Sequence, residues 1–347
     1  MKKALPAFVL ALSSVTALAQ IQFSATDLPQ QIGAYSRAYV STGNVAVASL
    51  PGAKGGPQRW DFSYAQGVGD HVRRLDLVAP TDGGHGADFP EAAYAERTTR
   101  EASGSQSWEY YRIIPTQGRT YYGFYDPVSN AADPVTVFDA PTIDLPETIA
   151  LNQSWQRTVD FTDLIDIGFI QVTVLVKFTS EAVVDAYGTV VLPAIGEVPA
   201  LRVNEVNTYE TFDLTLGLPL DTQIFRNYYW LVKDVGKAVH IISKPETTVP
   251  PENFQTASTV LRVFESSAVK PPPLRLSVKN LRAALKGKEL FLTWDKESPA
   301  TGYEVEFVDR LAPQATWSPL PKPTDNFLFD PLIVGPGSRF YRVFFTQ

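Results

Sequence analysis

Apolar and polar residues alternate along much of the chain with the two-residue period of β-strands. The clearest case is 170–178, where Gln171, Thr173 and Lys177 fall on one face and apolar residues on the other, at Ile170, Val172, Val174, Val176 and Phe178. A period this regular predicts an antiparallel strand with one buried face and one face in water.

Similar short runs fill the chain in two blocks. The first block contains candidate strands at 34–40, 44–49, 71–78, 92–99, 107–114, 119–125 and 135–138. The second contains candidate strands at 170–178, 183–186, 189–192, 201–211, 222–232, 238–243 and 259–265. Only 281–286 has a pattern that allows a helical turn. We therefore predict an all-β chain whose larger part is an antiparallel, sandwich-like domain.

Proline and glycine residues mark the boundaries. The Gly/Pro-rich stretches 51–57 and 81–86 are predicted to lack regular structure. The run Val269-Lys270-Pro271-Pro272-Pro273 reads as a semi-rigid linker, because proline fixes φ and lacks an amide donor. It separates a domain at 20–268 from a smaller one at 274–347. A composition shift at 141–150 leaves open whether 20–268 is one domain or two subdomains.

The N-terminus has the pattern of a secretory signal peptide. Lys2 and Lys3 form a short positive segment, an apolar stretch follows over 4–15, and Ala17-Leu18-Ala19 is a small-residue cleavage site. We expect 1–19 to be removed and the product to be periplasmic or extracellular. No second apolar run is long enough to span a membrane after cleavage.

Composition and motifs narrow the function classes. The chain has no cysteine, which excludes disulfides, thiolate metal sites and cysteine nucleophiles. Its formal net charge of −7 argues against nucleic acid and anionic membrane surfaces as partners. The sequence contains no Gly-x-Ser-x-Gly, His-Glu-x-x-His or Gly-rich phosphate loop.

Acidic residues nevertheless cluster in places, as at Asp160, Asp163 and Asp166, or at Glu205 and Glu210. A glycosidase needs two carboxyl groups about 5–10 Å apart across a cleft, which spacing along a strand does not establish. A polysaccharide-acting hydrolase with paired carboxylates is therefore an alternative, while a non-catalytic role is favoured.

Aromatic residues are concentrated in the runs 108–111, 121–125 and 228–230. Adjacent residues of a strand point to opposite faces, so each run places rings on both faces. Rings on an exposed face would form a platform for sugar rings or an apolar partner. The candidate ligand-binding residues are Trp108, Tyr110, Tyr122 and Tyr229. The other interpretation is that both faces are buried and the rings pair across strands.

The three histidines suggest one metal site at most. His85 is flanked by glycines and by Asp82 and Asp88, so a flexible loop could place two carboxylates and an imidazole around a divalent cation. The loop lacks calcium-loop spacing, and Gly/Asp clusters are also ordinary turn material. His240, between Val239 and Ile241 in an apolar strand, is interpreted as a hydrogen-bonded structural histidine. No other cofactor is expected.

The C-terminal part resembles a fibronectin type III domain. The matching residues are Leu292-Thr293-Trp294, Thr301-Gly302-Tyr303-Glu304-Val305-Glu306, and the turn and strand over 335–343 that carry Tyr341. The segment is shorter than the family norm, so an immunoglobulin-like sandwich is the other possibility. The resemblance implies a spacer or binding module and supplies no catalytic residues.

The larger part resembles an uncharacterised β domain that recurs in secreted bacterial proteins. The similarity rests on Trp60-Asp61-Phe62-Ser63, on 187–193 followed by 200–203, and on 229–236. It implies export and a sheet-rich fold. We expect an exported, non-catalytic binding or structural protein with a glycan or an extracellular protein as partner. A carrier of apolar ligands is a further alternative, which a large, dry concavity lined by Tyr, Trp and Val would support.

Overall fold

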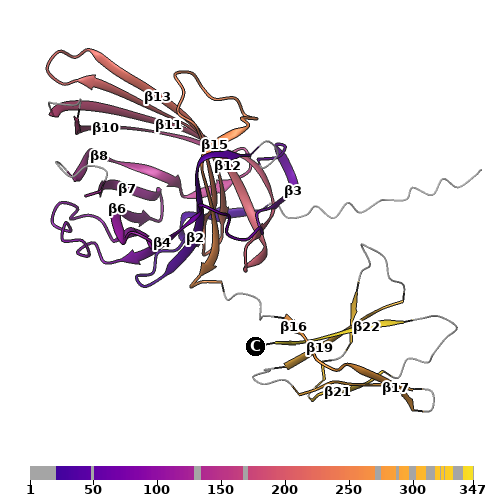
Figure 1. The fold of residues 1–347 in the computed structure, drawn as a ribbon. Helices are drawn as coiled ribbons and strands as arrows, with labels where there is room; N and C mark the ends of the chain where they lie inside the picture. The colour runs from indigo at the N-terminus through magenta and orange to yellow at the C-terminus, as the bar shows by residue number, and fades with distance from the viewer. Residues whose placement is uncertain are drawn as a thin grey trace, which may run out of the picture. The chain divides into compact units, whose positions relative to one another are not determined.

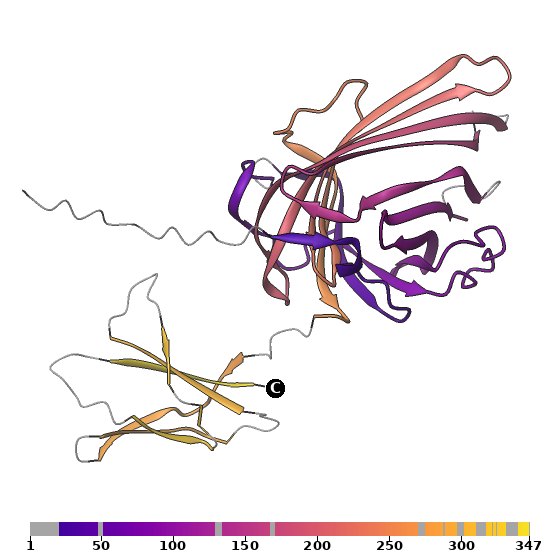
Figure 2. The same cartoon turned by 180° about the vertical axis from the view of Figure 1, so that it is seen from behind.

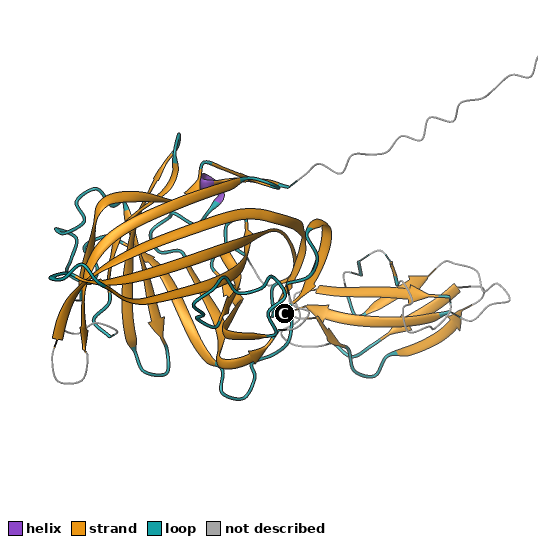
Figure 3. Cartoon of the chain, turned by 90° about the horizontal axis from the view of Figure 1, so that it is seen from above, coloured by secondary structure: helices purple, strands orange, loops and turns teal. Residues whose placement is uncertain are grey.

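The computed structural model of the chain is almost entirely strand and loop (Figure 3). It describes residues 21–47, 51–128, 134–166, 171–269, 275–286, 289–296, 302–309, 317–320, 322–323, 325–330 and 339–346. The predicted signal peptide at 1–19 and the three linker prolines lie outside these residues. The prediction of an all-β chain is confirmed. The chain divides into two compact units, Met1–Lys270 and Pro271–Gln347.

The first unit is built around one 13-stranded sheet. Its strands are β2 (Tyr35–Ala46), β3 (Gly55–Asp61), β4 (His71–Val78), β5 (Tyr94–Arg100), β6 (Ser105–Ile114), β7 (Gly118–Tyr125), β8 (Val135–Pro146), β10 (Ser154–Asp166), β11 (Gln171–Leu192), β12 (Gly196–Asp213), β13 (Pro219–Val232), β14 (Gly236–Ser243) and β15 (Thr256–Ser266). Strands from both sides of 141–150 belong to this sheet.

The sheet curls around an interior. Its order is β10-β11-β12-β13-β14-β15-β2-β4-β5-β6-β7-β8, with antiparallel neighbours throughout. The first and last strands of this order, β10 and β8, contact each other (Figure 1). The strand predicted over 170–178 is part of β11, and its alternation is confirmed at Val174, Val176 and Phe178, which are buried.

A second layer covers the outer face of part of this sheet. β11 has an irregularity between Val184 and Ala186, and beyond it pairs in parallel with β3. Trp60 and Phe62 pack edge-on against Trp230 of β13, with ring centroids 5.7 and 4.9 Å apart. These rings belong to the largest apolar core, which makes the unit sandwich-like.

The N-terminal segment contributes a further core inside the curled sheet. β1 (Gln22–Ser24) pairs with β9 (Thr148–Ala150), and the 3-10 helix η1 (Ala25–Asp27) follows. Phe23 and Leu28 pack with Leu145, Leu201 and Tyr229. In Figure 2, β1 and η1 belong to the indigo segment that leads into the sheet. Pro29, just after this segment, lines the interior cavity described below.

The second unit is a small sandwich of two sheets. One has the order β16-β22-β19-β20, from β16 (Arg275–Ser277), β22 (Phe340–Thr346), β19 (Gly302–Val308) and β20 (Ser318–Pro319). The other has the order β17-β18-β21, from β17 (Arg282–Lys286), β18 (Glu289–Thr293) and β21 (Phe327–Asp330). Leu292 and Trp294 share a core with Tyr303, Val305 and Val343.

Two local predictions are wrong. The segment 281–286 is not a helical turn, because 282–286 forms β17 and pairs with β18. Residues 55–57 of the stretch predicted to be irregular belong to β3. Pro57 is tolerated there because β3 pairs only with β11 among the described strands, so its other edge needs no amide donor.

Candidate functional site

The curled sheet encloses a cavity of about 530 Å³. Its walls come from nearly every strand of the sheet. The lining includes aliphatic residues of β4, β14 and β15 and small polar residues of β2, β5 and β6. Aromatic rings come from β7, β8, β10, β11 and β12. The charged residues that line it are Arg73, Glu96, Glu109, Arg119, Asp126, Asp144, Arg157 and Lys237.

One side of the cavity is an aromatic wall, formed by Tyr121, Phe124, Phe138, Phe161, Phe178 and Tyr209. These rings touch one another across strands: Tyr121 meets Phe138 at 4.9 Å between centroids, and Phe178 meets Tyr209 at 4.8 Å. The rings pack against each other and leave the centre open. The wall is therefore an apolar surface of fixed shape that faces the cavity.

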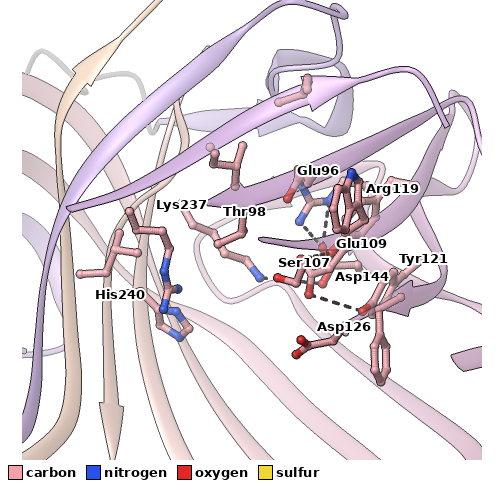
Figure 4. A pocket seen from close by; sticks show the side chains of 18 of the residues that line it. Glu96, Thr98, Ser107, Glu109, Arg119, Tyr121, Asp126, Asp144, Lys237 and His240 are labelled. Atoms are coloured by element: carbon pink, nitrogen blue, oxygen red, sulfur yellow. Dashed lines mark hydrogen bonds and ion pairs between the residues drawn. The ribbon is translucent and has the colours of Figure 1, made fainter. Parts of the chain in front are cut away.

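A cluster of buried ion pairs lies at one end of the cavity. Arg119 of β7 donates to Glu96 at 2.7 Å and, through Nε, to Asp144 at 2.8 Å. Arg157 of β10 pairs with the other oxygen of Asp144 at 2.8 Å and reaches Glu205 at 3.5 Å. Figure 4 shows Arg119 between Glu96 and Asp144. We call these five residues the ion-pair cluster.

Burial and charge act in opposite directions within this cluster. Burial raises the pKa of Glu96, and the positive charge of Arg119 offsets this only in part. Burial would also raise the pKa of Asp144, but Arg119, Lys237 and Arg157 outweigh it and hold that pKa well below its usual range. Asp144 is thus the fixed negative charge around which the cations are arranged.

These two carboxylates bear on the hydrolase alternative. Glu96 and Asp144 share an aromatic-lined cavity, yet both are hydrogen-bonded to the same guanidinium. Of the acids considered from the sequence, Glu205 belongs to the cluster, where Ser180 also donates to it at 2.7 Å. The arrangement is that of a hydrogen-bonded charge network, in which each of these carboxylates is bound by an arginine.

A second polar region lies on β4 and β14 and reaches the ion-pair cluster, because Lys237 of β14 lies 3.9 Å from Asp144. His240 and Lys237 project into the cavity from β14 (Figure 4). His240 packs edge-on against Tyr229, at 5.9 Å between centroids. Its Nε2 is buried without a hydrogen-bond partner in the part of the chain that the structure describes. The interpretation of His240 as a hydrogen-bonded structural histidine is therefore wrong for this nitrogen.

Electrostatics keep His240 neutral. Burial lowers the pKa of its imidazole to about 3, and the charges of Lys237 and Arg73 add to the effect. Arg73 is therefore close enough to His240 to act on its ring. Burial also lowers the pKa of Arg73, with Glu109 acting against the shift. Both side chains line the cavity.

The neutral state of His240 predicts an acid-sensitive stability. In the unfolded chain the imidazole titrates near its ordinary pKa of 6.5, whereas the folded group stays neutral until about pH 3. Stability present above about pH 6.5 is therefore lost as the pH falls toward 3. Between about pH 7 and about pH 4.5, we expect the free energy of unfolding to fall by about 2.5 kcal/mol more in the wild type than in His240→Gln. Urea titrations at several pH values measure this difference, and parallel pH curves for the two proteins would contradict it.

The four aromatic residues proposed from the sequence are all buried. Tyr110 and Tyr122 pack with Phe89 beneath the loop before β5, and Trp108 joins them and borders the cavity. Tyr229 lies in the core formed with the N-terminal segment. They form no exposed platform, and the interpretation with both faces buried is the one the structure shows. The aromatic surface that faces open space is instead the wall of the cavity.

The three residues proposed to bind a metal do not converge. Asp82 accepts a hydrogen bond from Trp108 at 2.9 Å and pairs with Arg97 at 3.2 Å. His85 and Asp88 contact each other at 3.1 Å. Across the described residues, no group of three or more His, Asp or Glu side chains is arranged to hold a metal ion. The metal hypothesis fails because Asp82 is committed to an arginine and an indole.

Most residues that line the cavity were not predicted from sequence patterns. Arg73, Arg119, Asp144 and Arg157 lie far apart in sequence and belong to no recognisable motif. The one available signal was a charged residue at an inward position of a strand, such as Arg119, which occupies the buried side of β7. A buried charge requires partners, but the alternation does not say which strands supply them.

Comparisons with known proteins leave the family open. No protein-family model matches the sequence, and no curated protein or solved structure gives a significant match. Among the described residues, no helix has the length and apolar character needed to cross a bilayer.

Proposed function

We propose that the first unit is an exported binding protein for a small amphipathic ligand, which it holds inside the curled sheet. The observation that carries this proposal is the cavity of about 530 Å³, which has the size of typical small-molecule sites. Of the functions considered from the sequence, the apolar-ligand carrier fits this geometry best. The concavity expected for such a carrier was to be lined by Tyr, Trp and Val; residues of all three types line this cavity, together with phenylalanine rings and charged side chains.

The arrangement of the walls supports binding over catalysis. The aromatic wall offers a ligand apolar contact area at little entropic cost, because its rings are already held by their neighbours. The carboxylates of the ion-pair cluster are held in place by arginines, so they form a fixed polar end of the cavity. A preformed apolar site with a few placed polar groups is typical of small-molecule binding.

A neutral fluorescent probe tests the proposal. We expect N-phenyl-1-naphthylamine to bind the mature chain with enhanced, blue-shifted emission, because it enters an apolar site. A large side chain that fills the cavity should weaken binding of the probe. Thr98 lines the cavity from β5, and we expect Thr98→Trp to lower the affinity for the probe at least tenfold. Thr99→Trp is the matched control, since Thr99 is the next residue on β5 and does not line the cavity.

The outcome separates an interior site from a surface site. Equal binding by the wild type, Thr98→Trp and Thr99→Trp would place the probe outside the cavity and count against the proposal. Absence of any binding by the folded wild type would do the same. Circular dichroism and the melting temperature of each variant show whether the fold is retained.

A further inference from the structure

The wall formed by β4 and β14 carries hydrogen-bond donors that the protein itself does not use. Arg73 lines the cavity, is partly buried, and forms no hydrogen bond or ion pair with any residue in the described ranges. His240 has a buried ring nitrogen without a partner among the same residues. Lys237 lies on the same wall and is paired with Asp144 at 3.9 Å. A buried polar atom without a partner costs stability, so the retention of Nε2 of His240 in this wall, close to Arg73, needs a reason.

Each carboxylate that lines the cavity, by contrast, accepts at least one hydrogen bond from the protein. Glu109 accepts hydrogen bonds from the hydroxyls of Tyr111 and Tyr121, at 3.2 and 3.4 Å. Asp126 accepts from the backbone amide of Val128 at 3.1 Å. Glu96 and Asp144 are bound by Arg119. The carboxylates that line the cavity therefore accept hydrogen bonds from the protein, whereas Arg73 and Nε2 of His240 have no hydrogen-bond partner among the described residues.

Small residues keep the space in front of this wall open. Ala38 and Ser36 of β2 line the cavity, and Ala38 is the register partner of Arg73. Neither side chain is long enough to fill the volume above it. A ligand group placed there would meet the guanidinium of Arg73 with His240 nearby, and its remainder would extend toward the aromatic wall.

We propose that the ligand of this cavity is an amphipathic anion, whose carboxylate or similar oxyanion pairs with Arg73 and whose apolar body lies against the aromatic wall. The inference rests on the proposed binding function and specifies its ligand class. Arg73 supplies a planar donor fork suited to an oxyanion, Lys237 supplies a further charge, and His240 supplies an N–H in the tautomer that is protonated at Nε2. The anion provides the partner that Arg73 lacks in the free protein.

Three ten-carbon compounds that differ in charge test the inference by competition. Decanoate, decan-1-ol and decylamine are titrated against bound N-phenyl-1-naphthylamine at neutral pH, with the full mature chain. We expect decanoate to displace the probe at a concentration at least tenfold lower than decan-1-ol, and decylamine to compete least. All three share one alkyl chain, so the order reports the charge preference of the site.

Substitution of Arg73 locates the effect. Arg73→Met keeps the unbranched apolar part of the side chain and removes the guanidinium, and we expect it to weaken decanoate binding about tenfold while leaving decan-1-ol binding unchanged. Arg112→Met is the matched control, because Arg112 is exposed on β6 and does not line the cavity. The melting temperature of ligand-free Arg73→Met should not fall, since the guanidinium has no partner. A marked fall would contradict that premise and with it the proposal.

The remaining outcomes distinguish the two levels of inference. If decanoate and decan-1-ol compete equally, or if decylamine competes best, the anionic ligand class is overturned while the proposed binding function stands. If the wild type does not bind the neutral probe at all, the proposed function fails first. Equal losses of decanoate affinity in Arg73→Met and Arg112→Met would show that only the net charge of the protein matters. That result would overturn the role of Arg73.

Discussion

Asp144→Ala is expected to lower the free energy of unfolding of the first unit by about 3–5 kcal/mol, the usual cost of removing one partner from a buried ion pair. Asp144 accepts hydrogen bonds from Arg119 and Arg157, and Lys237 lies 3.9 Å from it. Without this carboxylate, two buried guanidinium groups face each other with Glu96 and Glu205 as their remaining counter-charges.

A surface ion pair provides the matched control. Glu197 pairs with Arg59 at 2.9 Å, and more than half of each side chain is exposed. Because solvent screens this pair, Glu197→Ala should change the free energy of unfolding by less than about 1 kcal/mol. Urea titrations followed by circular dichroism measure both variants. Similar values for Asp144→Ala and Glu197→Ala would show that the ion-pair cluster does not support the fold.

The ion-pair cluster also links stability to binding. Arg119 and Asp144 join β7 to β8, and Arg157 brings in β10, the strand at the other end of the sheet order. These strands also carry Tyr121, Phe138 and Phe161 of the aromatic wall. Loss of Asp144 is therefore expected to loosen the wall and weaken cavity probes, even in conditions where the unit remains folded.

The strands themselves were predictable because their signal is local. A strand buried on one side shows its two-residue period within a few residues, as Val174, Val176 and Phe178 do in β11. The full length of each strand was harder to predict from the sequence. β11 is one strand of 22 residues, where the pattern suggested separate runs, because its two ends bury different faces on either side of the irregularity at Val184.

The cavity could not be predicted from the sequence, because it depends on the curvature of the sheet and on the register between its strands. Adjacent rings such as Tyr110 and Tyr111 were correctly expected on opposite faces, but their surroundings were not. Tyr110 meets Phe89 from a loop, and Tyr111 meets Tyr121 from the next strand. Sequence spacing gives a residue's face, whereas the contents of the interior depend on how far the sheet bends.

The second large effect is expected at Gly188, where two strands approach too closely for a side chain. Gly188 pairs with Gln58 in the parallel β11–β3 ladder. A Cβ added at this position would overlap the carbonyl oxygen of Gln58 and lie 2.5 Å from the amide nitrogen of Gln58, closer than van der Waals contact allows. Both atoms belong to the backbone, so no side-chain rotation relieves the overlap, and β3 must move away from β11.

Displacement of β3 removes much of the outer core. Trp60 and Phe62 would leave their contacts with Trp230, and Arg202 would lose the carbonyl of Gly52, which it reaches at 3.1 Å. Because exposure of one large core ring typically costs about 3–5 kcal/mol, we expect Gly188→Ala to lower the free energy of unfolding by at least about 3 kcal/mol. Urea titrations give the loss, and proteolysis within 51–62 reports whether β3 has detached.

Gly67→Ala is the matched control for this substitution. The nearest atom to a Cβ there belongs to the Asp70 side chain at 3.4 Å, an ordinary contact, so the change should be small. Because β3 packs on the outer face, the inward residues Arg73 and His240 keep their surroundings when it detaches. Under mild conditions, Gly188→Ala should therefore still bind N-phenyl-1-naphthylamine while β3 is cleaved. Simultaneous loss of probe binding and of β3 would instead show that the outer layer and the cavity fold as one inseparable unit.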